Sequence, residues 1–214
     1  MSQNGALRRE VLQLYVDAAV AFIPMDLYAE YYIMNPEMLV DVSRQTMWEI
    51  LNTFHIRNED ELRKDIAWTI AVGRRLEFAR TCQQLSILSE AERNKFIEEA
   101  ETAQDKHKRA VANYYLRRMP PGGIGAYDFS YAVFKCLGGR QLKCLSEDEM
   151  WGYIGSLANL MRNSYSNWYD YTMGFAVGFE YFSPEMSQTY LSADRQRLMR
   201  LLNLRKSPLL QIRL

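Results

Sequence analysis

Apolar residues recur at helical spacing along most of the chain. In the first third they mark three amphipathic stretches, at residues 6–23, 43–54 and 58–71. Asn58 followed by Glu61 is typical of the start of a helix. Gly73 is expected to break the third helix or to allow a close helix crossing. No strand-like alternation of apolar and polar residues stands out, so the pattern predicts an all-α fold.

The helical pattern continues from residue 90 to residue 118, where it predicts one long or gently broken helix. Ser89 with Glu92 forms a capping-box pattern at its start. The segment MPPGGIG, residues 119–125, then interrupts the pattern more strongly than any other. It predicts a loop and is a candidate hinge between two helical halves. We expect one all-helical domain over residues 1–214.

The densest apolar and aromatic surface lies between residues 126 and 182, where three consecutive helices are expected. The first covers 126–137 and should end at Gly138 and Gly139. Ser146 with Glu149 caps the second, and the third begins at Ser166 or Asn167. We therefore predict a compact multi-helix globule with this helical trio at its centre.

Composition and charge narrow the class of protein. Hydrophobic residues make up 48% of the 214 residues, and 26 basic residues balance 26 acidic ones. A net charge of zero gives no global field to attract nucleic acid. The first residues lack the pattern of a signal peptide, and no apolar run is long enough for a membrane span. A cytoplasmic protein without membrane insertion is expected.

Asp128 is the most suggestive polar residue because it interrupts an apolar helix. A buried carboxylate needs a partner, for which Arg140, Arg74 and Arg75 are candidates, and its pKa could suit acid-base chemistry. With Glu149 as a second carboxylate, Asp128 and Arg140 form a candidate polar site. The structural alternative is favoured, in which Asp128 stabilises its helix or one ion pair and Glu149 serves the capping box.

Other kinds of chemistry find less support. His55 and His107 are the only histidines, and neither has a second ligand at metal spacing. Cys136 lies in an apolar helix where a thiol is expected to be inert, and the three cysteines form no CxxC pair. The sequence predicts no catalytic residue, no metal site and no cofactor.

Two segments are candidates for an interaction surface. Tyrosine and tryptophan are common at binding hot spots, and part of the aromatic segment 165–182 is expected to be exposed. The C-terminal segment is rich in arginine and could bind an acidic partner, nucleic acid, lipid headgroups or the acidic helices of the chain itself. The candidate residues are Tyr169, Asp170, Tyr181, Arg195, Arg197 and Arg200.

A series of motifs follows in order between about residues 47 and 182. They are Leu51 with Phe54-His55-Ile56, Gly73-Arg74-Arg75, Tyr127-Asp128, Gly138-Gly139, Ser146-Glu147-Asp148-Glu149 with Trp151, Tyr165-Ser166-Asn167-Trp168, and Gly174. In this the chain resembles a bacterial family known as domain of unknown function 1266. The family usually has Trp at the position of Tyr127 and a basic residue near Ser130 and Tyr131. An Asp-Arg site present in relatives could therefore be absent here.

The resemblance implies an all-helical bacterial intracellular protein with no established activity. The occurrence of such proteins near secreted-toxin genes suggests an immunity role. The leading hypothesis is therefore a non-enzymatic interaction protein, most concretely an immunity protein that binds and neutralises a cognate toxin through a broad complementary surface. The alternative is an enzyme or small-ligand binder that uses a polar cleft around Asp128 and Glu149.

Overall fold

The structure is a computed structural model, and it describes residues 8–23, 29–183, 201–203 and 205–214. The candidate residues Arg195, Arg197 and Arg200 lie outside the described residues. None of the helices in the described ranges is long and apolar enough to cross a membrane.

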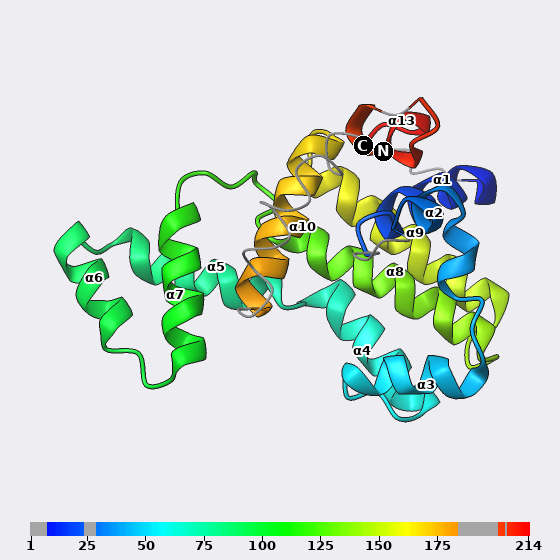
Figure 1. The fold of residues 1–214 in the computed structure, drawn as a ribbon, viewed down its shortest axis with the longest axis horizontal. Helices are drawn as coiled ribbons and strands as arrows, with labels where there is room; N and C mark the ends of the chain where they lie inside the picture. The colour runs from blue at the N-terminus through cyan, green and yellow to red at the C-terminus, as the bar shows by residue number, and fades with distance from the viewer. Residues whose placement is uncertain (1–7, 24–28, 184–200, 204) are drawn as a thin grey trace, which may run out of the picture.

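The described residues form α-helices and one short 3-10 helix, with no strand among them, which confirms the predicted all-α fold. The elements, shown in Figure 1, are α1 Arg9–Val20, α2 Ala29–Met34, the 3-10 helix η1 Pro36–Leu39, α3 Arg44–Thr53, α4 Glu59–Ala71, α5 Arg75–Ser86, α6 Glu90–Glu98, α7 Ala103–Tyr115, α8 Gly125–Gln141, α9 Glu147–Ser164, α10 Trp168–Phe182 and α13 Pro208–Gln211.

Helix α8 lies at the centre of the molecule. It packs against α9 and α10, as the sequence predicted for the helical trio, and also against α1, α3 and α4. A second, smaller core joins α5, α7 and α10 through buried side chains that include Phe78, Tyr115 and Tyr181. Figure 1 shows α5, α6 and α7 extending to one side of the main body, with α10 between them and the rest.

The prediction that Gly138 and Gly139 end the central helix is wrong, because α8 continues through both to Gln141. The two glycines are needed for close approach instead. A Cβ on Gly138 would lie 2.7 Å from Sδ of Met47 on α3, and one on Gly139 would lie 2.7 Å from Cδ2 of Leu62 on α4. Without side chains there, α3 and α4 can pack directly on the α8 backbone.

The predicted helix starts are confirmed. Asn58, Ser89 and Ser146 each accept a hydrogen bond from a backbone N–H three residues on, and Asn167 caps α10 in the same way. The helix expected over residues 90–118 is broken more sharply than predicted, into α6 and α7. Thr102 starts the second of these by accepting from the backbone N–H of Asp105. Capping signals thus located helix starts more reliably than periodicity located their ends.

Candidate functional site

Asp128 lies in the first turn of α8, and its side chain is only 2% exposed. Its Oδ2 accepts the backbone N–H of Arg75, the first residue of α5, at 2.9 Å, and lies 3.4 Å from Nη1 of the same residue. The carboxylate therefore satisfies the start of α5 from a different helix, where the helix dipole also favours a negative charge. The arginine partner, expected to be Arg140, Arg74 or Arg75, is Arg75.

The Arg75 side chain also secures the end of α4. Nη1 donates to the Thr69 carbonyl at 2.6 Å, and Nη2 donates to the Ile70 carbonyl at 2.9 Å. Both carbonyls belong to the last turn of α4, where helices leave carbonyls without partners. One ion pair thus joins the end of α4, the start of α5 and the start of α8.

Gly73 makes the turn between α4 and α5 possible, which confirms that it breaks the helix. Its φ of +68° lies in the region that favours glycine. A Cβ on Gly73 would also overlap Nη1 of Arg75 and Oδ2 of Asp128. The Gly73-Arg74-Arg75 motif and Asp128 are therefore parts of a single structural junction.

The electrostatics of Asp128 follow from this junction. Burial raises the pKa of its carboxyl group, and the hydrogen bonds and charge of Arg75 and the backbone of Arg74 oppose that shift. Oδ2 of Asp128 accepts a hydrogen bond from the backbone of Arg75, and both terminal nitrogens of the Arg75 guanidinium donate to carbonyls of α4. The arrangement holds three helices together.

The structure does not bring the three residues of the predicted polar site together. Arg140 is exposed in the last turn of α8, twelve residues from Asp128 or about 18 Å along the helix axis. Glu149 lies in the first turn of α9, where it completes the capping box with Ser146 and accepts from Nε of Arg63 at 3.0 Å. These contacts lower the pKa of Glu149 to about 2.

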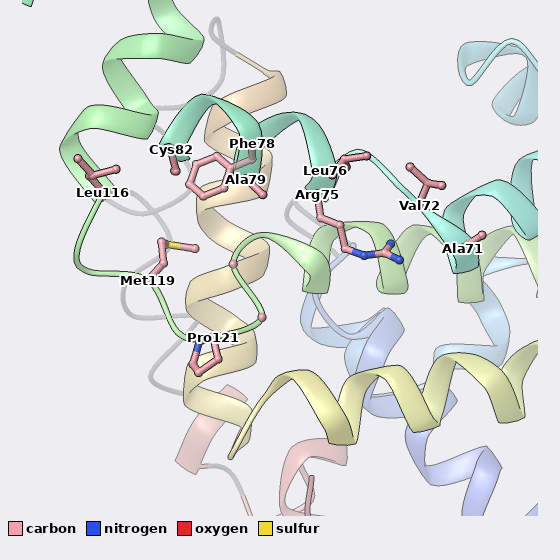
Figure 2. Close-up of a pocket in the computed structure, with 12 residues that line it drawn as sticks. Ala71, Val72, Arg75, Leu76, Phe78, Ala79, Cys82, Leu116, Met119 and Pro121 are labelled. Carbon is pink, nitrogen blue, oxygen red and sulfur yellow. The ribbon is translucent and has the colours of Figure 1, made fainter. Parts of the chain in front are cut away.

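A cavity of about 520 Å³ lies next to the junction, between α5 and the connection from α7 to α8. Figure 2 shows Phe78, Ala79 and Cys82 of α5 on one side and Leu116, Met119 and Pro121 on the other. Val72 and Leu76, each 37% exposed, lie at its edge, and Arg75 is the one charged residue among the described residues that line it. Most of the lining is apolar, and the volume is in the range of ligand and anchor pockets.

Tyr165 fixes the glycine-rich wall of this cavity. Its hydroxyl accepts the backbone N–H of Ala126 at 2.8 Å and lies within hydrogen-bond distance of the carbonyls of Gly122 and Gly123. Tyr165 is itself buried, and burial raises the pKa of its hydroxyl group. The wall formed by Gly122 and Gly123 is therefore held in place from behind.

One cysteine lines the cavity, and a second cysteine and a histidine lie elsewhere in the fold. Burial raises the pKa of the Cys82 thiol to about 11, which keeps it protonated and a weak nucleophile at neutral pH. Cys136 is fully buried in α8, and burial raises its pKa as well. His107 lies on α7 and donates from Nε2 to the Glu180 carbonyl at 2.7 Å. In the described ranges, no three His, Cys, Asp or Glu side chains gather closely enough to hold a metal ion.

The candidate interaction residues on α10 differ in their exposure. Tyr169 is 62% exposed, as expected, and Asp170 is partly buried next to the capping residue Asn167. The expectation for Tyr181 is wrong, since it is 1% exposed. Its ring packs edge-on against Phe78 at 5.3 Å, and its hydroxyl lies 3.2 Å from that of Thr81. The α5–α10 contact, which helical spacing alone did not reveal, buries this face of α10.

The chain is thus an all-α protein with a structural Asp-Arg junction and an adjoining apolar cavity. The family model described as protein of unknown function (DUF1266) matches residues 49–214. The chain therefore belongs to the DUF1266 family, and the match extends past the C-terminal limit of the region of about 47–182 indicated by the motifs. No curated protein and no solved structure matches it.

Sequence reasoning missed the cavity, although it singled out residues of one wall. The 119–125 segment was recognised as a loop, and Met119, Pro121, Gly122 and Gly123 of this segment line the cavity. The other wall comes from α5, about forty residues earlier in the sequence. Only the packing of α5 against α7 brings the two together. Val72 and Leu76 gave no signal in the sequence, because their exposure is known only from the structure.

Proposed function

We propose that the protein is a non-enzymatic binding protein that takes an apolar side chain of a protein partner into the cavity between α5 and residues 116–124. The observation that carries this proposal is the apolar concave surface itself, with Val72 and Leu76 at its edge. Exposed apolar surface of this kind is typical of interaction sites.

The polar groups near the cavity support binding over catalysis. Asp128 and Arg75 are occupied by the helix junction, and Cys82 is a weak nucleophile. Recognition then depends on shape and on removal of apolar surface from water. Burial of one leucine- or phenylalanine-sized side chain contributes about 1.5–3 kcal/mol, enough for an anchor residue at an interface.

An immunity protein that neutralises a secreted toxin is the most specific form of this proposal, and the toxin is then the partner. This form stays a prediction. It requires that a toxin encoded near this gene bind the full chain, which can be tested with the purified pair.

A matched pair of variants tests the proposal. Leu76→Asp places a charge at the edge of the cavity, at a position near the start of α5 where an acidic residue is tolerated. Ile87→Asp, at the other end of α5 and 82% exposed, is the control because Ile87 does not line the cavity. Tagged full-length protein is used to capture partners from the producing bacterium.

We expect Leu76→Asp to lose the captured partner and Ile87→Asp to keep it. The loss of one buried anchor contact corresponds to about tenfold or more in affinity. Equal capture by both variants would show that the partner binds elsewhere, and loss in both would point to a general effect of added charge on α5.

The cavity also favours a second candidate function, that of a small-ligand carrier, because a volume of about 520 Å³ suits a small apolar molecule. Native mass spectrometry of protein purified from the producing bacterium tests this. A mass adduct present in the wild type and lost in Ala79→Trp, which fills the cavity, would favour the carrier, whereas wild-type protein without an adduct would favour the protein partner.

A further inference from the structure

A second cavity of about 250 Å³ lies where α6 faces the end of α7, and its chemistry differs from that of the first. Its lining residues are Arg93 from α6, Asn113 and Tyr114 from α7, and Leu116, Arg117 and Arg118 from the following segment. Leu116 lines both cavities, so the two adjoin at this residue.

Three arginines gather here, and none of the described lining residues is a carboxylate. None of Arg93, Arg117 and Arg118 forms an ion pair with any carboxylate that the structure describes, whereas Arg63, Arg75 and Lys135 each do. Like charges close together repel, and an anion between them converts this repulsion into attraction. The cavity is therefore electrostatically suited to a negatively charged ligand.

Arg93 adds an independent observation. Its Nε is buried and has no hydrogen-bond partner within the described part of the chain. Its Nη1 donates to the Leu88 carbonyl at 3.4 Å, which is long for a hydrogen bond. Leaving a buried donor unsatisfied is unfavourable, and such a group in a folded protein calls for an explanation. The described residues thus leave the hydrogen bonding of the Arg93 guanidinium incomplete beside this cavity.

Arg118 is held in position by its neighbour. Its guanidinium lies over the Tyr114 ring, 4.6 Å from the ring centre, and this contact orients the cation at the end of α7. Arg117 is exposed and can turn toward a ligand. Asn113 adds an amide group to the lining.

We propose that Arg93, Arg117 and Arg118 form a binding site for a phosphate-type oxyanion, such as the phosphate group of a phosphomonoester. The planar guanidinium fork suits bidentate contact with phosphate oxygens. Three positive charges match a dianion better than the single charge of one carboxylate, and the volume admits a phosphate and a few attached atoms. This site goes beyond the proposed function, because it takes a small anion in a different cavity.

Inorganic phosphate is the probe for a direct test. Amide spectra of the full-length, isotopically labelled protein are followed as phosphate replaces chloride at constant ionic strength. We expect saturable shifts at Arg93 and in residues 113–118. The double variant Arg117→Gln/Arg118→Gln should bind phosphate at least about tenfold more weakly, because two charge-assisted contacts are lost.

Two controls make the outcome specific. Arg140→Gln removes an exposed arginine at the distant end of α8, and Leu76→Asp alters only the first cavity. Both should bind phosphate with unchanged affinity, so failure of this site is distinguishable from failure of the partner site. Shifts that do not saturate, or that persist at unchanged affinity in the arginine double variant, would overturn the proposal.

Discussion

Replacing Asp128 by alanine tests whether this carboxylate serves the architecture. The substitution removes the acceptor of the Arg75 backbone N–H and the ion-pair partner of its guanidinium, in a site where the Asp128 side chain is 2% exposed. Removing one partner of a buried ion pair costs about 3–5 kcal/mol. Release of the buried charge, whose burial raises the pKa of Asp128, offsets part of this cost. We therefore expect a loss of about 3 kcal/mol.

Urea unfolding followed by circular dichroism measures this loss. With an m value of about 2–3 kcal/mol/M, the midpoint should fall by about 1–1.5 M. Hydrogen exchange provides a local readout, because the Arg75 amide should lose protection in Asp128→Ala. Asp148→Ala is the control. Its carboxylate is 89% exposed in a surface pair with Arg9, and its loss should cost less than about 1 kcal/mol.

A cost for Asp128→Ala as small as that of the Asp148 control would refute the reasoning. It would mean that the junction of α4, α5 and α8 is stable without the carboxylate. Asp128 would then regain its place as a candidate acid or base for the alternative function.

Three further predictions concern stability. Contacts with Arg63 and Ser146 lower the pKa of Glu149 from 4.5 to about 2. The stability that its carboxylate contributes is therefore present above pH 4.5 and is lost as the pH falls toward 2. Denaturation across this range should show a smaller loss of folding stability in Glu149→Gln than in the wild type. Gly174→Ala should lower stability by about 1–3 kcal/mol in thermal unfolding, because its Cβ would lie 2.6 Å from the Tyr165 hydroxyl oxygen. Gly155→Ala is the matched change at a glycine with open space around it, and it should raise stability by about 0.4–1 kcal/mol. Burial raises the pKa of Tyr181 to about 12 and also raises those of Tyr127, Tyr131 and Tyr165. The stability that these neutral hydroxyl groups contribute below pH 10 should therefore be lost as the pH rises through their raised pKa values. In an alkaline titration, tyrosinate absorbance should rise together with the loss of helical signal.

Capping residues predicted the helix starts, which depend on residues close together in the sequence. The helix starts at Asn58, Ser89, Ser146 and Asn167 were read correctly, because a capping side chain bonds to a backbone group three residues away. The glycine pair in α8 was misread because the same residue type serves both helix ends and close helix contacts. Only the contacts of Gly138 with Met47 and of Gly139 with Leu62 distinguish the two.

The candidate site depended on contacts between distant residues. Asp128 stood out in the sequence as a polar interruption of an apolar helix, and Arg75 was one of its three candidate partners. Arg140 was a candidate because the helix was expected to end at Gly138 and Gly139. The continuation of α8 to Gln141 instead places Arg140 about 18 Å from Asp128 along the helix axis. Tyr181 was wrongly expected to be exposed. The residues that bury it belong to α5, about one hundred residues earlier in the sequence, and spacing along α10 does not reveal that contact. The family match supports the motif order and adds no activity.

A second buried ion pair on the central helix resembles that of Asp128. Lys135 on α8 is 6% exposed, and its Nζ lies 2.6 Å from Oδ2 of Asp65 on α4 and 4.6 Å from the centre of the Phe54 ring. Like Asp128, it interrupts an apolar helix and connects it to a neighbouring element. Charged residues at such positions thus join α8 to the helices packed on it.

We have proposed that recognition takes place in the apolar cavity beside α5. A photo-crosslinking amino acid placed at Leu76 of the protein, and separately at Ile87, tests this proposal in the cells that naturally produce the protein. We expect a covalent adduct with a discrete protein from position 76 and none of that protein from position 87. The same adduct from both positions, or an adduct from position 87 alone, would contradict it.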